Sequence, residues 1–260
     1  MSKKAVLVVS YGTSYIETRE KTIGAVEKAI SAAFPDRELR RAFTAKMVIG
    51  IIKKKEGVTV DFVTDALQKL LDEGFDDVLV QSTHVTNGGQ YDFVVDAVRE
   101  FKGKFASMSL GSPLLTSDDD YDEVVKAVID TYYPRDPDSA LVVMGHGTEH
   151  YANATYSQLM MKFWYAGYRN VYDTTAGRFP DFRQTAADMR GKGYRNVTLM
   201  PLLVVAGDHV TNDIVGEGDE SLLSIMRREG YNVTADLRSL GEVPVFQRMF
   251  VEHALAAKRI

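Results

Sequence analysis

Short apolar runs rich in β-branched residues alternate along this chain with longer amphipathic segments. The strongest runs show no alternation of polar and apolar positions, which is typical of strands covered on both faces, as in a parallel sheet. Strands are predicted at residues 5–9, 78–81, 107–110, 140–144, 197–205 and 233–237, and more weakly at 38–43 and 170–175.

The segments between these runs have helical periodicity. Apolar residues share one helical face in three sets: Ile23, Val26, Ile30 and Phe34; Phe62, Ala66 and Leu70; and Tyr121, Val124, Val128 and Tyr132. Ser14 followed by Glu17 reads as a capping box and predicts a helix that begins just after the loop Ser10–Ser14. Alternating strands and helices of these lengths predict an α/β fold with right-handed crossovers.

The chain also repeats itself. Four motif pairs occur in the same order at offsets of 119 to 135 residues, which favours duplication over chance. They pair VVSYGT at 8–13 with VVMGHGT at 142–148, GFDDV at 74–78 with GYRNV at 193–197, HVTN at 84–87 with HVTN at 209–212, and SLGSP at 109–113 with SLGEVP at 239–244.

Two similar α/β lobes follow from this duplication. They are expected at residues 1–135 and 136–260, joined by the proline-containing segment 133–138, and the last helix could pack on the first lobe. A cleft between such lobes, at the carboxyl ends of their strands, is the expected ligand site.

Composition excludes several classes of function. Lys and Arg number 31 and Asp and Glu 36, so the net charge of −5 gives no electrostatic footprint for nucleic acid or an anionic membrane. The absence of Cys excludes disulfides, thiolate metal ligands, Fe–S clusters and thiol nucleophiles. The first apolar run is too short for a signal peptide or a membrane span, so a cytoplasmic location is expected.

Three of the five histidines, His84, His146 and His209, follow predicted strands. A single histidine at such a place often caps a helix or fills a hydrogen-bonding niche, and His253 in the C-terminal amphipathic run is expected to be a packing residue. Equivalent strand ends in repeated halves favour a functional role for His146 and His209. Imidazole binds divalent metals and acts as a general base near neutral pH. His150 has ligand spacing from His146 only if a helix forms there.

The loop Ser10–Ser14 lies between a strand and a helix, where backbone N–H groups can bind a carboxylate or phosphate. It lacks the Gly-Lys-Ser/Thr ending of a P-loop and the GxGxxG fingerprint, so no nucleotide is expected. No GxSxG elbow supports a serine hydrolase. The basic segment from Arg40 to Lys55 is either a solvated face or one wall of a site for a polyanion.

These residues resemble the class II chelatases, and more closely the anaerobic cobalt chelatases of the CbiK type. The resemblance spans nearly the whole chain. Its best stretches are residues 7–14, 41–44, 66–70, 144–147, 200–202 and 205–209.

The resemblance implies two Rossmann-like lobes with a tetrapyrrole cleft between them and ATP-independent insertion of Co(II) into sirohydrochlorin, a polycarboxylated macrocycle. Fe(II) or Ni(II) are alternative metals, and a homo-oligomer is left open. It assigns catalysis and metal binding to His146 and His209, with His146 as proton acceptor. Substrate binding is assigned to Ser10, Tyr11, Gly12, Thr13, Ser14, His84, Asn87 and Gln90.

Two positions depart from the family pattern. Gly177, near Phe179-Pro180, stands where the family has a glutamate that ligates metal, and Gln90 stands where it often has an acid. Asp173, Asp181 or Glu149 could substitute. The missing carboxylates motivate an alternative function, a tetrapyrrole- or metal-binding carrier. A two-lobed binding receptor is a third reading, against which the absent export signal counts.

Overall fold

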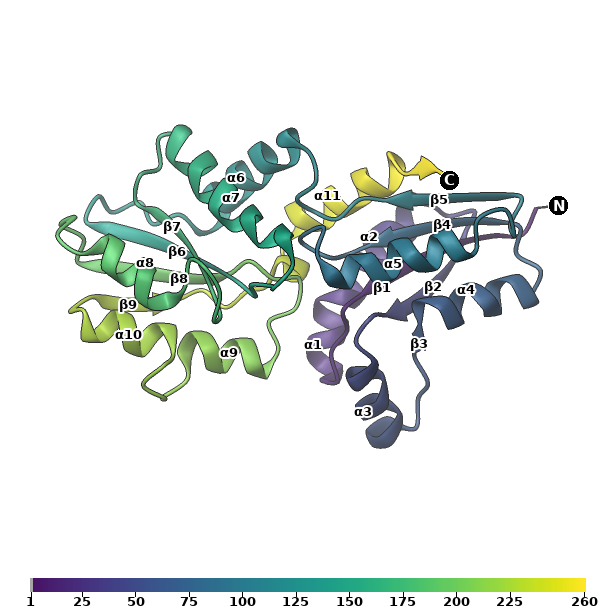
Figure 1. The fold of residues 1–260 in the computed structure, drawn as a ribbon, viewed down its shortest axis with the longest axis horizontal. Coiled ribbons are helices and arrows are strands. Elements are labelled where there is room, and N and C mark those ends of the chain that lie inside the picture. Colours follow the sequence, from purple (N-terminus) through teal and green to yellow (C-terminus); the bar gives the residue numbers. More distant parts are fainter. Residues whose placement is uncertain (1) are drawn as a thin grey trace. The chain divides into compact units, whose positions relative to one another are not determined.

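The computed structural model describes residues 2–260, without the side chains of residues 208–211. The described chain divides into two compact units (Figure 1). The first runs to Thr116 and includes Gly241–Ile260, and the second is Ser117–Leu240. These bounds differ from the expected lobes 1–135 and 136–260. The difference arises because the helix before residue 133 packs within the second unit and the last helix packs within the first.

The first unit contains one sheet of six described strands in the order β10-β5-β4-β1-β2-β3. All pairings are parallel except β10 with β5. The strands are β1 (Lys4–Ser10), β2 (Glu38–Phe43), β3 (Asp61–Phe62), β4 (Asp77–Ser82), β5 (Ser107–Gly111) and β10 (Lys258–Arg259); the helices are α1 (Ile16–Lys21), α2 (Ile23–Ala33), α3 (Lys46–Glu56), α4 (Val63–Asp72), α5 (Gly89–Glu100) and α11 (Pro244–Leu255).

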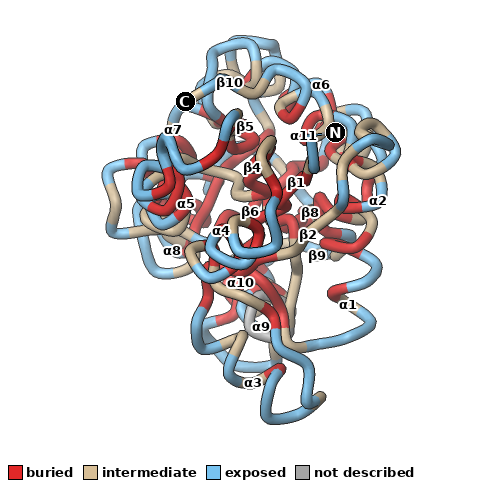
Figure 2. Tube along the Cα trace, turned by 90° about the vertical axis from the view of Figure 1, so that its right-hand side faces the viewer, coloured by how far each residue is buried: buried red, intermediate tan, exposed pale blue. Residues whose placement is uncertain are grey.

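Both faces of this sheet are covered, as the uninterrupted apolar runs predict. Alternate β1 residues, Ala5, Leu7 and Val9, pack in one cluster with apolar residues of α4 and α5. Val6 and Val8 are also fully buried, and α2 and α11 pack on each other and on the sheet. Fully burying a valine or leucine contributes about 1.5–3 kcal/mol relative to exposure, so each covered strand is a major source of stability. Figure 2 shows this buried interior along the central strands.

The second unit has a parallel sheet in the order β7-β6-β8-β9. Helices α6 and α7 pack together, and α8, α9 and α10 contribute to the other cluster of buried residues. The elements are β6 (Ser139–Gly145), β7 (Val171–Thr175), β8 (Asn196–Pro201), β9 (Asn232–Ala235), α6 (Asp118–Tyr132), α7 (Ala154–Tyr165), α8 (Phe182–Met189), α9 (Asp208–Val215), α10 (Leu222–Arg228) and the 3₁₀ helices η1 (Tyr151–Asn153) and η2 (Leu240–Glu242).

The two sheets share a topology that matches the sequence repeat. The order β5-β4-β1-β2 in the first unit corresponds to β9-β8-β6-β7 in the second. The repeated motifs fall on equivalent elements, because residues 8–13 leave β1 as residues 142–148 leave β6, and the two HVTN segments follow β4 and β8. The predicted α/β fold with parallel sheets is confirmed.

Three local predictions need correction. The strand predicted at 197–205 ends at Pro201, where Leu202 N still donates to Met144 O but the chain then leaves the sheet. The capping box at Ser14 does not form, because α1 begins at Ile16 with Tyr15 as its N-cap residue; the Thr13 hydroxyl accepts from the Tyr15 amide. Phe62 ends β3 instead of lying within a helix.

Within the described residues, each helix is either too short or too polar to cross a membrane.

Gly12 is a position where side-chain bulk should be costly. Its φ is +103°, and a Cβ there would lie 2.5 Å from the ring of Phe43. Gly57 is a matched control, since its φ is +70° and a Cβ would meet no atom within 4 Å. Gly57→Ala should lower the free energy of unfolding by about 1 kcal/mol, and Gly12→Ala by about 3 kcal/mol because overpacking adds to backbone strain. Urea unfolding followed by circular dichroism measures both; equal effects would show that the Phe43 contact relaxes freely.

Candidate functional site

His146 directly follows β6, and its side chain is exposed at the carboxyl end of that strand. Its Nδ1 lies 3.0 Å from the carbonyl oxygen of Gly147. A carbonyl oxygen only accepts, so this contact requires the proton on Nδ1 and leaves Nε2 as the acceptor of the neutral ring. The structure therefore places an exposed imidazole at the carboxyl end of a strand, as predicted.

The segment around His146 is held from two sides. Gly145 lies under the ring of Tyr156, so close that a Cβ would be 2.0 Å from Tyr156 Cε1, and the Tyr156 hydroxyl accepts from Gly147 N at 3.4 Å. Burial raises the pKa of Tyr156 to about 12, so the phenol stays neutral. Asn153 accepts from the amide of Thr148 at 2.9 Å. These contacts fix the backbone that carries the imidazole.

His209 lies at the start of α9, eight residues beyond the end of β8 at Pro201, but its side chain is outside the described residues. Strands β6 and β8 are neighbours in one sheet, with Met144 paired to Pro201. His146 and His209 therefore follow adjacent strands of the same unit. The prediction that their side chains act together is not tested by this arrangement of the backbone.

Each of the three carboxylates considered as substitute metal ligands, Asp173, Asp181 and Glu149, is either enclosed or already engaged with another group of the protein. Asp173 in β7 is 1% exposed, and neither carboxyl oxygen has a hydrogen-bond partner among the described residues. Burial raises the pKa of Asp173 well above its usual value, because the enclosed site disfavours the charged carboxylate. Asp181 caps α8 by accepting from Gln184 N, and Glu149 pairs with Arg178.

Gly177 lies between β7 and α8, with φ +77° and no atom within 4 Å of a Cβ. Among the residues with described side chains, no three His, Asp or Glu gather as a metal site.

In the loop Ser10–Ser14 most side chains face the protein. Ser10 is buried and its hydroxyl accepts from Thr83 at 2.7 Å. Gly12 and Thr13 are also buried, whereas Tyr11 is 47% exposed and Ser14 is half-buried. Of the predicted binding loop, the Tyr11 side chain is thus the one most open to a ligand.

His84 and Asn87, also predicted to bind substrate, are tied into the first unit. The His84 ring lies between two hydroxyls, with Nδ1 2.8 Å from Ser82 Oγ and Nε2 3.2 Å from Thr44 Oγ1. Burial lowers the pKa of His84 to about 4. Asn87 donates to Leu115 O and to Thr116 Oγ1, both at 3.0 Å. His84 is therefore a neutral link between the ends of β4 and β2.

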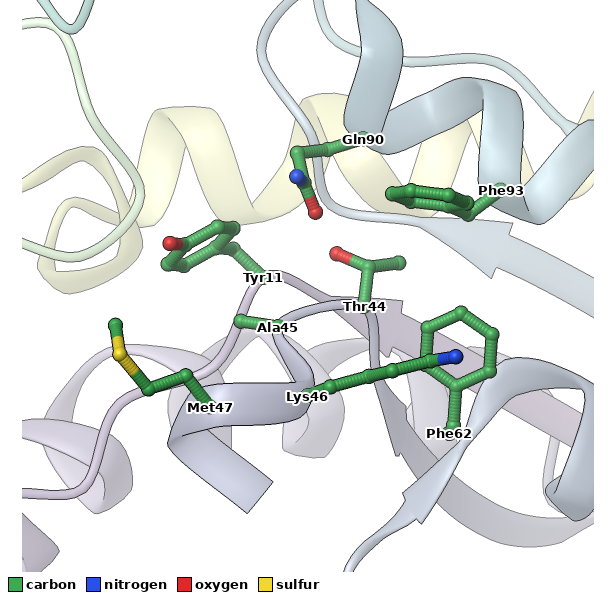
Figure 3. Close-up of a pocket in the computed structure, with 8 residues that line it drawn as sticks. All are labelled: Tyr11, Thr44, Ala45, Lys46, Met47, Phe62, Gln90 and Phe93. Atoms are coloured by element: carbon green, nitrogen blue, oxygen red, sulfur yellow. The ribbon is translucent and has the colours of Figure 1, made fainter. Parts of the chain in front are cut away.

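A pocket of about 350 Å³ opens in the first unit where β1 and β2 end and α3 and α5 begin (Figure 3). Two predicted substrate-binding residues, Tyr11 and Gln90, point into it. The Gln90 Oε1 is buried without a hydrogen-bond partner among the described residues. The other lining residues are Thr44, Ala45, Lys46, Met47, Phe62 and Phe93.

Sequence reasoning named Tyr11 and Gln90, and it placed Lys46 in the basic segment interpreted either as a solvated face or as one wall of a site for a polyanion, but it missed the other lining residues. Residues 44–47 follow β2, which lies beside β1 in the sheet, so their strand-end position was the signal that could have identified them. Phe62 and Phe93 had no such signal, since apolar periodicity assigns residues of this kind to a core.

Comparison with known proteins gives matches over nearly the whole chain. The family model described as "Cobalt chelatase (CbiK)" matches residues 4–259. A sirohydrochlorin cobaltochelatase of Salmonella typhimurium is 38% identical over 262 aligned positions, covering 96% of this chain and 95% of the relative. The sirohydrochlorin cobaltochelatase CbiKC of Nitratidesulfovibrio vulgaris is 32% identical, covering 99% and 91%.

Solved structures agree on the fold. SirB from Bacillus subtilis, solved with Fe³⁺, aligns with a TM-score of 0.68 at 14% identity, covering 97% of this chain and 94% of its own. CbiX, described as the terminal enzyme for biosynthesis of siroheme in denitrifying bacteria, aligns with a TM-score of 0.58 at 16% identity, covering 98% and 100%. At these identities the likeness shows a shared two-sheet α/β architecture.

His84 should make stability depend on pH in one direction. Its pKa of about 4 in the folded protein is below the ordinary value of 6.5, so the unfolded chain binds more protons between these values. Stability from this residue is present above pH 6.5 and is lost as the pH falls toward 4, at up to about 1.4 kcal/mol per pH unit.

The variant His84→Gln lacks this titration. It should be less stable than the unaltered protein at pH 7, with the gap narrowing as the pH falls to 4.5. Urea unfolding at both pH values measures the gap. Parallel stability curves for the two proteins would show that His84 is not held neutral by burial.

Proposed function

Because the chain belongs to the cobalt chelatase (CbiK) family, we propose that it inserts Co(II) into sirohydrochlorin, with His146 as the proton acceptor. The curated relatives that cover most of its length are sirohydrochlorin cobaltochelatases. The observation that carries the residue assignment is the exposed imidazole of His146 at the end of β6, with Nε2 unoccupied by any described residue.

The chemistry requires a base. A metal ion can occupy the centre of the macrocycle only as the two pyrrole N–H protons leave, so a group beside the ring must accept them. Imidazole exchanges protons near neutral pH and contributes about 10²–10⁴-fold as a general base. The contact of Nδ1 with the carbonyl of Gly147 aims the lone pair of Nε2 away from the backbone. His146 is therefore built to receive a proton and release it to solvent.

The metal is a substrate in this reaction, so its binding must be reversible. With no Cys in the chain, imidazole nitrogens are the strongest ligands available to a borderline divalent ion. We propose His146 and His209 as the pair that presents the metal. Asp173 is enclosed and burial raises its pKa, and Gly177 supplies no carboxylate. Such a site favours transfer of the metal ion to the macrocycle over its retention by the protein. Fe(II) and Ni(II) are alternative substrates of the same site.

Substrate binding is assigned to the first unit's strand ends. Tyr11 and Gln90 line the pocket there, and backbone amides of the loop Ser10–Ser14 are proposed to meet substrate carboxylates. ATP independence follows from the family assignment and stays a prediction. So do the cytoplasmic location, the oligomeric state and the absence of nucleic-acid and membrane partners.

Replacing His146 by Ala should lower the rate of Co(II) insertion by about 10²-fold or more, because the substitution removes the proposed proton acceptor. His209→Ala should abolish insertion as well. The absorbance of sirohydrochlorin, followed after addition of Co(II), Fe(II) or Ni(II), measures the rate and the metal preference.

Two further measurements separate catalysis from structure. Added imidazole should restore part of the activity of His146→Ala, with a rate that rises as imidazole becomes deprotonated, whereas a folding defect would not respond. His253→Ala is the matched control, because His253 lies in α11 of the first unit and should leave insertion unchanged. Full activity in both His146→Ala and His209→Ala would refute the assignment.

A carrier that binds the tetrapyrrole without metallating it is the second candidate. It is favoured by Gly177, which stands where the family resemblance predicts a metal-ligating glutamate. Tight binding of sirohydrochlorin with no spectral change on adding any of the three metals would establish the carrier and exclude the chelatase.

A further inference from the structure

The pocket of the first unit joins a cation to an apolar wall. Lys46 is the only charged residue that lines it, and no acidic residue is among the lining set. Three of its apolar side chains are unusually open for their size: Tyr11 at 47%, Met47 at 72% and Phe93 at 46% exposed. Exposed apolar side chains that gather around one concave surface are typical of a binding site.

Lys46 is held in place without losing its donors. Its Nζ lies 4.7 Å from the ring centre of Phe62, and Phe62 meets Phe93 edge to face at 5.9 Å. Figure 3 shows the lysine side chain extended along the pocket toward the Phe62 ring. A cation–π contact attracts the charge but takes up no hydrogen-bond acceptor, so the ammonium N–H groups remain available.

The basic residues of β2, the strand that precedes Lys46, are engaged in ion pairs within the protein. Arg40 pairs with Glu73, and Arg41 pairs with Glu27. Lys46 has no ion pair with any described residue. An ammonium that is oriented by an aromatic ring and unpaired is suited to bind an anion from outside the chain.

The opposite side of the pocket supplies a complementary group. The side chain of Gln90 reaches down between Tyr11 and Thr44 (Figure 3), and its Oε1 is buried without a described partner. An acceptor left unsatisfied in this way costs about 1–3 kcal/mol, which an incoming N–H or O–H group, water included, would recover. The pocket thus offers a cation, a vacant acceptor and flat apolar walls within a few side chains of one another.

We propose that this pocket binds one edge of the tetrapyrrole, with ring atoms and side-chain methylenes against Tyr11, Met47 and Phe93, and one peripheral carboxylate on Lys46. Lys46 is then a specificity-determining residue that selects carboxylated macrocycles. The inference rests on the proposed function, whose substrate it locates. The volume of about 350 Å³ is near the lower end of ligand pockets, about 300–1,000 Å³, so it accommodates an edge and not a whole macrocycle.

The test measures binding of metal-free sirohydrochlorin to the whole protein by titration of its absorbance. Three variants are compared with the unaltered chain. Lys46→Met keeps the length and removes the charge, Lys46→Arg keeps the charge, and Lys54→Met makes the same charge change on an exposed residue of the same helix outside the pocket. A sirohydrochlorin ester, which lacks the carboxylates, is the second ligand.

Lys46→Met should weaken binding of the acid about tenfold, as expected for one charge-assisted contact in a partly exposed site, whereas Lys46→Arg and Lys54→Met should stay within about threefold. The dependence of binding on salt should be weaker in Lys46→Met. The ester should bind all four proteins with similar affinity.

The outcomes separate this inference from the proposed function. Equal binding of the acid by the unaltered chain and Lys46→Met overturns the role of Lys46 while leaving metal insertion intact. If binding requires Lys46 but no metal is inserted, the proposed role of the pocket is supported and the proposed chelatase activity is overturned. Failure of the unaltered protein to bind sirohydrochlorin overturns both.

Discussion

The parallel pairing of buried strands is the constraint on which the rest of this structure depends. β1 lies between β2 and β4, and β6 lies between β7 and β8, each pair in a register that brings carboxyl ends to one edge. Helices cover both faces, so polar side chains with chemical roles can gather only where the strands stop. His146, Thr44, His84 and Tyr11 all lie within a few residues of such a stop.

The duplicated sheets have diverged in how they treat equivalent positions. His84 and His209 begin identical HVTN segments after equivalent strands, β4 and β8. In the first unit this histidine is enclosed between Ser82 and Thr44 and has a depressed pKa. The first unit thus uses its histidine to hold strand ends together and presents aromatic and amide groups in a pocket. Among the histidines with described side chains, the exposed one is His146 in the second unit.

Sequence alone predicted the strands well, since eight apolar or β-branched runs correspond to eight strands. It also placed His146 correctly at a strand end, because a buried run followed by Gly-His-Gly has one natural reading in an α/β fold. It failed at the start of α1, where Tyr15 and not Ser14 is the N-cap residue and no side chain caps the helix. Likewise the pocket residues Phe62 and Phe93 look like core residues in sequence, and only tertiary packing leaves them at a surface.

The open surroundings of Gly177 determine which side chains this turn can accept. A Cβ added at Gly177 would meet no atom within 4 Å. The left-handed backbone would lower the free energy of unfolding by only about 1 kcal/mol for a residue other than glycine. A single substitution of Gly177 by an acidic residue would thus place a carboxylate at this turn with only a small loss of stability. The turn at Gly177 therefore has room for a carboxylate without any rebuilding of the sheet, at the position where the family resemblance predicts a metal ligand.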